Sequence, residues 1–218
     1  MKRLIAIAIV LTMLLSMSGC GCQHTPGDFS VASVDTASLT MKLEQNCSTC
    51  GKVLETKECA TGTAPEAGKM YLSPADWFSC LATNIRNYGA SQSLMPVEPE
   101  AQEDTLLFSV VNLSGLKTVM SFHDKDGNAL TTEQRSDSSA VQSIHIQAQF
   151  PNDAAPQFYI LLAMIAITNN NELAAEEASQ IADMIMGGME VTDNGYVYQM
   201  VITSVEDQTV MLVINVAE

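Results

Sequence analysis

Four cysteines are the residues of this 218-residue chain whose type and spacing could do chemistry. Cys47, Cys50, Cys59 and Cys80 follow the pattern C-x2-C-x8-C-x20-C. Four thiols can form two disulfides in any of three connectivities, hold one tetrahedral zinc ion, or offer their closest pair as a redox dithiol. The elements that position these cysteines, and the compartment in which they act, decide whether they form disulfides, bind zinc or act as a redox dithiol.

The N-terminus predicts that compartment. Met1-Lys2-Arg3 is a short basic start, and Leu4–Leu15 is an apolar run that matches a secretory signal but is too short to span a bilayer as a helix. Ser18-Gly19-Cys20 follows this run. This order of a basic start, an apolar run, small residues and a cysteine resembles the bacterial lipoprotein class of signal peptides. In that class a cysteine after a small residue is lipidated and becomes the first residue of the mature chain.

The resemblance implies a signal peptide over residues 1–19, a tether over 20–28 lipidated at Cys20, and an extracytoplasmic domain over 29–218. A diacylglyceryl group would then hold the protein on the cell membrane. Later apolar runs do not reach transmembrane length, the longest being Phe158–Ile167, which suits a helix buried on all sides. We therefore expect a protein that is anchored to the membrane by lipid and does not span it.

An extracytoplasmic location favours disulfides, because exported proteins meet oxidising conditions more often than cytosolic ones do. We expect Cys47, Cys50, Cys59 and Cys80 to form two structural disulfides, with Cys80 joining a helix to the loop that carries the others. The sequence predicts no bound metal or cofactor on this interpretation.

Two alternatives use the same thiols differently. Residues 47–52 (CSTCGK) resemble a zinc knuckle, in which Gly51 lets backbone amides approach the sulfurs, so all four cysteines are weak candidates for a zinc site. A redox dithiol at Cys47 and Cys50 would need a helix directly after the motif, to lower a thiol pKa by its dipole. The segment Lys52–Lys57 is short and holds two β-branched residues, which does not favour that helix.

Local patterns predict an α+β fold, with antiparallel sheets packed against two or three helices. Strands are expected at residues 29–35, 38–44, 105–112, 116–123, 143–150, 189–192, 196–203 and 209–216, and helices at 73–88, 154–168 and 172–186. The cysteine-bearing loops are expected between residues 46 and 70, and a linker or sub-boundary at 91–104. A helix followed by strands occurs twice, so an ancient duplication of an α-β-β(-β) unit is a hypothesis.

The firmest local signals lie in one helix and one hairpin. Trp77, Leu81 and Ile85 recur every four residues and predict a buried stripe on a helix capped at Ser73 or Asp76. Asn194-Gly195 is a typical two-residue hairpin turn.

Charge and motif content restrict the function. The formal net charge of −15 disfavours nucleic acid and gives no attraction to anionic lipid surfaces. The three histidines form no recognisable catalytic set, and the sequence lacks G-x-S-x-G, H-E-x-x-H and dinucleotide-binding patterns. We expect a non-enzymatic protein that binds a protein or small ligand, or that serves in an envelope assembly. The alternative is an envelope thiol-redox or zinc protein centred on Cys47 and Cys50.

Overall fold

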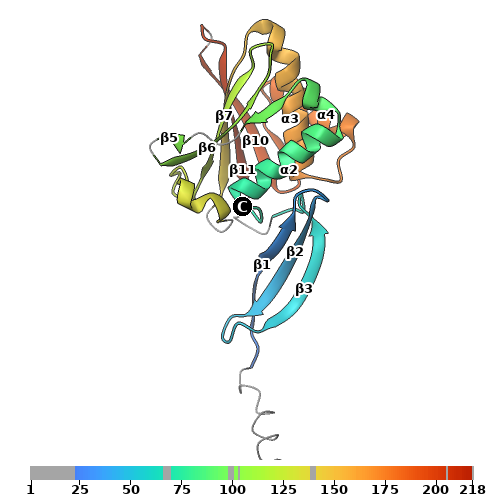
Figure 1. The fold of residues 1–218 in the computed structure, drawn as a ribbon, viewed down its shortest axis with the longest axis vertical. Coiled ribbons are helices and arrows are strands. Elements are labelled where there is room, and N and C mark those ends of the chain that lie inside the picture. The colour runs from blue at the N-terminus through green and yellow to red at the C-terminus, as the bar shows by residue number, and fades with distance from the viewer. Residues whose placement is uncertain are drawn as a thin grey trace, which may run out of the picture. The chain divides into compact units, whose positions relative to one another are not determined.

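The computed structural model describes residues 23–65, 70–97, 101–102, 104–137, 141–204 and 206–217. Within these ranges the chain forms three α-helices and two antiparallel sheets, so the predicted α+β class is confirmed (Figure 1). Cys20 and Cys22, together with the expected signal peptide, lie outside the described residues.

The chain divides into two compact units. One comprises the chain up to Ser30 together with Leu43–Lys57, and the other comprises Val31–Lys42 together with Glu58–Glu218. The first unit carries the closely spaced pair Cys47 and Cys50, and the second carries Cys59 and Cys80.

A three-stranded sheet in the order β1-β2-β3 is formed by β1 (Pro26–Asp35), β2 (Thr40–Cys47) and β3 (Val53–Ala60). The first two confirm the predicted strands, whereas β3 falls in the segment that was predicted to be a loop. The β3 side chains are nearly all exposed or half-buried, so the strand shows no apolar alternation and gives no sequence signal. The ring of Phe29 lies 3.9 Å from the ammonium of Lys57.

The larger, eight-stranded sheet has the order β4-β6-β7-β8-β11-β10-β9, with β5 paired to β6. Its strands are β4 (Met95–Val97), β5 (Ala101–Gln102), β6 (Thr105–Val111), β7 (Lys117–His123), β8 (Ser143–Gln149), β9 (Val191–Asp193), β10 (Tyr196–Ser204) and β11 (Thr209–Val216). The turn between β9 and β10 holds Asn194 and Gly195 at φ values of 47° and 78°. These are the left-handed conformations that the predicted hairpin requires.

The segment 91–104, predicted to be a loop or linker, contributes β4, which is the strand at one edge of the larger sheet. Pro96 lies in β4 and pairs with Val110 of β6. A proline is tolerated there because an edge strand needs only one of its two hydrogen-bonding sides. Residues 95–97 of the segment expected to be a loop or linker therefore form a strand.

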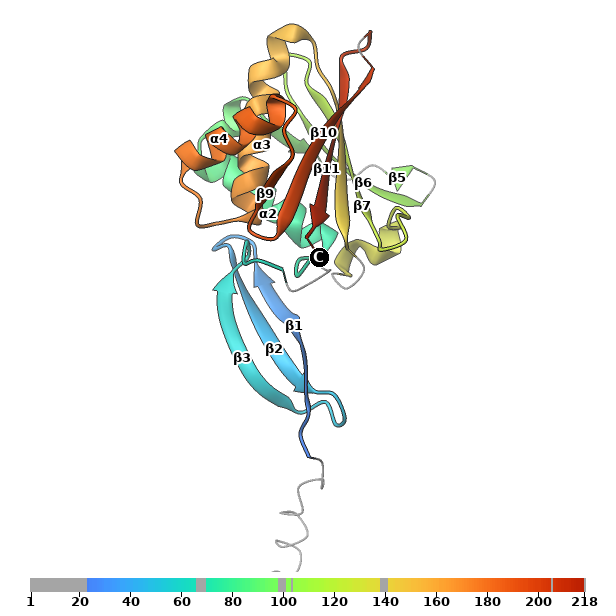
Figure 2. The ribbon, with the colours of Figure 1, turned by 180° about the vertical axis from the view of Figure 1, so that it is seen from behind.

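The three helices α2 (Pro74–Asn87), α3 (Ala155–Asn169) and α4 (Ala175–Met186) lie together on one face of the larger sheet (Figure 2). Ser73 caps α2 as predicted, because its side-chain oxygen accepts a hydrogen bond from the amide of Asp76. The stripe of Trp77, Leu81 and Ile85 is buried, each at 1% exposure or less.

The helix α3 is apolar around most of its circumference and has ten buried residues among its fifteen, so the expected apolar helix is largely buried. Its last residue, Asn169, lies inside the core and accepts a hydrogen bond from the indole N–H of Trp77 at 2.7 Å. The same amide donates to the hydroxyl of Tyr198 on β10 at 3.0 Å. One buried asparagine thus satisfies two aromatic polar groups on different elements.

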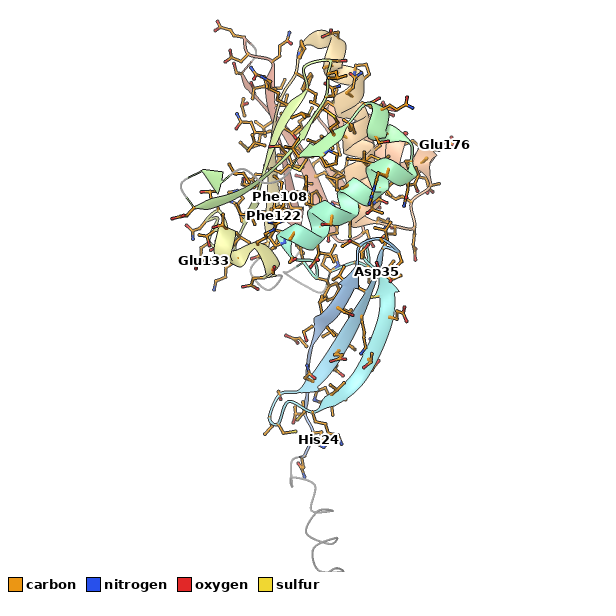
Figure 3. The ribbon with its side chains drawn as sticks, viewed as in Figure 1. His24, Asp35, Phe108, Phe122, Glu133 and Glu176 are labelled. Carbon is orange, nitrogen blue, oxygen red and sulfur yellow. The ribbon has the colours of Figure 1, made fainter. Side chains whose placement is uncertain are left out.

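Aromatic rings fill the space between α2 and the sheet. Phe108 on β6 and Phe122 on β7 meet edge to face with their ring centroids 5.7 Å apart (Figure 3). Trp77 meets Phe122 in the same manner at 5.7 Å. This packing orients α2, on which Cys80 lies. In the described part of the chain, no helix combines the length and apolar character needed to cross a bilayer.

Candidate metal centre

The turn between β2 and β3 brings Cys47 and Cys50 together. Cys47 ends β2, and its amide donates to the carbonyl of Lys52 at 2.8 Å. The amide of Gly51 donates back to the carbonyl of Cys47 at 2.9 Å. Gly51 adopts a left-handed φ of +72°, a conformation that costs other residues energy. The glycine therefore closes the tight turn that holds both thiols on one side of the hairpin end.

The residues before β1 bring a third group to this turn. The amide and the hydroxyl of Ser48 both donate to the carbonyl of Thr25, at 2.9 and 3.2 Å. This connection fixes His24 beside the cysteine turn, at the end of the three-stranded sheet (Figure 3). The imidazole Nδ1 of His24 lies 3.5 Å from Sγ of Cys50.

The ligand atoms of His24, Cys47 and Cys50 all lie within 4.8 Å of one another. Across the described ranges, this is the one group of three or more His, Cys, Asp or Glu side chains that could hold a metal ion. Cys47 is buried at 2% exposure, whereas His24 and Cys50 are exposed. The cluster thus has one ligand inside the fold and two that reach solvent.

Electrostatics favour the thiolate of Cys47. The hydrogen bond with the His24 side chain is the largest of the effects that together lower the pKa of this thiol to about 5. The amides of Cys50 and Thr49 and the Cys50 thiol lower it further, while burial opposes them. Cys47 is therefore a thiolate at neutral pH, which is the form that binds metals.

The separation between the ligand atoms of His24 and Cys50 fits a zinc ion. Zn–S bonds of about 2.3 Å and Zn–N bonds of about 2.0–2.1 Å, at a tetrahedral angle, place a sulfur and a nitrogen ligand about 3.5 Å apart. The observed separation between His24 Nδ1 and Cys50 Sγ is 3.5 Å. Amides directed at the Cys47 sulfur, and a glycine after Cys50, are the features expected of a zinc knuckle. The residues present therefore fit zinc as His24, Cys47 and Cys50.

The predicted four-cysteine set needs correction. Cys59 and Cys80 are not members of the cluster, and His24, which the sequence places in a polar tether, is. The Cys80 thiol is buried on α2 with the Thr61 side chain as its hydrogen-bond partner, and burial raises its pKa to about 11. Cys80 is thus a buried core residue outside the cluster.

Two disulfides were expected among these cysteines, but no disulfide joins Cys47, Cys50, Cys59 or Cys80 in the structure. Cys80, predicted to be joined to the cysteine turn, packs within the second unit beside Thr61.

The context of a thioredoxin-like dithiol is also missing. That chemistry uses a helix N-terminus directly after the motif, and here β3 begins at Val53. The low thiol pKa of Cys47 has a different origin, chiefly the neighbouring imidazole.

The remaining polar groups form ordinary structure. Asp124 accepts hydrogen bonds from the amides of Asp126 and Asn128, both at 2.9 Å, as expected of a polar turn. His123 and His145 stack with their ring centroids 3.8 Å apart, and each is near a serine on its own strand.

Comparison of the chain with protein-family models, with curated proteins and with solved structures finds no match.

Proposed function

We propose that this chain is a lipid-anchored, extracytoplasmic bacterial protein that binds a thiophilic metal ion, zinc in the first instance, through His24, Cys47 and Cys50. The observation that carries the proposal is the cluster in which the sulfurs of Cys47 and Cys50 and a ring nitrogen of His24 lie within 4.8 Å of one another. Thiolate and imidazole ligands together suit zinc and other soft metals better than calcium or magnesium.

The exposure of the two thiols favours binding over catalytic thiol exchange. An enzyme that attacks substrate disulfides needs its low-pKa thiolate at the surface. Here the thiolate belongs to Cys47, which is 2% exposed, while the exposed thiol belongs to Cys50. A buried thiolate can still bind a small ion that enters from the side of His24 and Cys50.

The proposed anchor places this site near the membrane. Cys20 precedes His24 by four residues, and an extended chain spans at most about 3.6 Å per residue, or about 14 Å here. A lipid on Cys20 would hold the site at the bilayer surface, in reach of a membrane protein that supplies or accepts the ion.

Metal titration tests the binding proposal. The reduced, metal-free, full-length protein in detergent is titrated with Zn²⁺ against a chromophoric chelator. We expect one ion per chain, with at least tenfold weaker binding for His24→Ala, Cys47→Ser and Cys50→Ser. Cys59→Ser and Cys80→Ser are matched controls, since both thiols lie outside the cluster. Unchanged affinity in Cys47→Ser, or no binding to the unmutated protein, contradicts the proposal.

Fatty-acid labelling tests the anchor. Cells expressing the protein receive an alkyne-bearing fatty acid, and the purified protein is examined for label. We expect Cys20→Ala to lose the label and Cys22→Ala to keep it. Label that persists in Cys20→Ala contradicts lipidation at this residue.

A further inference from the structure

We propose that the metal site is redox-gated: an external disulfide converts Cys47 and Cys50 into an intramolecular disulfide, and the metal ion leaves. This inference rests on the proposed metal binding and adds its regulation. It starts from the separation of the two sulfurs, which lie within 4.8 Å of each other on one turn. A disulfide requires about 2.05 Å between them, so the two sulfurs must approach each other by a change in the turn.

The turn has room for that change. Ser48, Thr49 and Gly51 are exposed, and an added carbon on Gly51 would meet no atom within 4 Å. Ser48 is hydrogen-bonded to Thr25, and the backbone hydrogen bonds from Cys47 to Lys52 and from Gly51 to Cys47 close the base of the turn. Because the side chains between these bonds are exposed, Cys50 can approach Cys47 without displacing packed side chains.

The unequal exposure of Cys50 and Cys47 decides which thiol reacts first with an external disulfide. The thiol of Cys50 is exposed, so a disulfide in solution meets this residue first. Cys47 is 2% exposed and is shielded from a bulky reagent. It is, however, near enough to Cys50 to displace a group attached there.

The chemistry balances as two thiol–disulfide exchanges. The Cys50 thiolate attacks one sulfur of an external disulfide RSSR, forming a mixed disulfide and releasing one thiolate RS⁻. The Cys47 thiolate then attacks the Cys50 sulfur, forming the Cys47–Cys50 disulfide and releasing the second RS⁻. The two cysteines lose two electrons, which reduce RSSR to two thiolates.

Metal release follows from the loss of ligands. A disulfide sulfur is a poor ligand compared with a thiolate, so two of the three ligands disappear and His24 alone remains. The site would thus hold its ion while reduced and empty when oxidised. An extracytoplasmic position would expose it to the oxidising conditions that make this transition relevant.

The test uses the zinc-loaded full-length protein, oxidised glutathione as the disulfide, and a zinc indicator dye. We expect one zinc ion released per chain, in step with a Cys47–Cys50 disulfide detected by peptide mass spectrometry, and rebinding after reduction with dithiothreitol. The double variant Cys59→Ser/Cys80→Ser should behave identically. Cys47→Ser should instead accumulate glutathione attached to Cys50.

Two outcomes overturn the proposal. One is zinc retention while glutathione oxidises other thiols; the other is zinc release with a stable mixed disulfide at Cys50 and no Cys47–Cys50 bond. Experiments on the metal-free protein separate a failure of the metal proposal from a failure of the gating proposal. If zinc never binds but the Cys47–Cys50 disulfide forms readily, the metal proposal fails while the reactivity of the thiol pair stands. If zinc binds and the disulfide does not form, the gating alone fails.

Discussion

The imidazole Nδ1 of His24 lies 3.5 Å from Sγ of Cys50, across 26 residues of chain. The contact joins the segment before β1 to the turn between β2 and β3. It brings a nitrogen ligand to two sulfur ligands, and it is accompanied by the hydrogen bond that most strongly lowers the pKa of Cys47. Binding and electrostatics at the candidate centre therefore both depend on His24.

His24→Ala is predicted to raise the pKa of Cys47. The thiolate absorbance at 240 nm of the reduced, metal-free protein should show its first step near pH 5, because Cys47 has a thiol pKa of about 5. Removing the imidazole deletes the largest cause of that shift, so the step should move toward the ordinary value of 9.0. His145→Ala is the matched control, since His145 lies on β8 outside the cluster. An unchanged first step in His24→Ala contradicts this account.

The same thiol predicts a pH dependence of stability. Cys47 has a lower pKa in the folded chain, about 5, than its ordinary value of 9.0. Between these values the unfolded chain binds a proton that the folded chain does not, so stability rises with pH. The contribution of Cys47 is complete above pH 9 and is lost as the pH falls to 5.

Urea unfolding of the reduced, metal-free protein at pH 9 and pH 5 measures this contribution. The unmutated protein should lose more stability between the two pH values than Cys47→Ser does, because other titrating groups are common to both. Equal losses in the two proteins would show that the Cys47 pKa is not lowered by folding.

Asn169→Ala is predicted to destabilise the larger unit. The substitution leaves the buried indole N–H of Trp77 and the hydroxyl of Tyr198 without their partner. Each unsatisfied buried group costs about 1–3 kcal/mol, so we expect a total loss of about 2–6 kcal/mol. Urea unfolding followed by fluorescence of the single tryptophan measures it. Asn215→Ala, at an exposed position of β11, should change stability by less than about 0.5 kcal/mol. A loss equally small for Asn169→Ala refutes the bridging role.

Much of the larger unit was predictable because its elements carry local signals. The stripe of Trp77, Leu81 and Ile85 has helical spacing, and all three side chains are buried. Ser73 precedes a proline and an aspartate that suit the start of a helix. Asn194-Gly195 can adopt the left-handed turn that other pairs avoid. In each case the deciding interaction lies within a few residues of the signal.

The candidate centre was only half predictable. The C-x-x-C-G motif is local and indicated the turn, but β3 has largely exposed side chains and was hidden from pattern analysis. His24 stands in a polar stretch with no signal of its own. Folding β1 against β2 about the turn after Asp35 would have placed His24 opposite the cysteine turn. Hairpin register, rather than residue spacing, contained the information.

X-ray absorption spectroscopy of the zinc-loaded full-length protein tests the central claim most directly. We predict a first shell with two sulfur ligands at about 2.3 Å and an imidazole nitrogen at about 2.0–2.1 Å. The imidazole scattering should disappear in His24→Ala, while both sulfurs remain. A shell of only nitrogen and oxygen ligands, or of four sulfurs with no imidazole in the unmutated protein, would contradict a centre made by His24, Cys47 and Cys50.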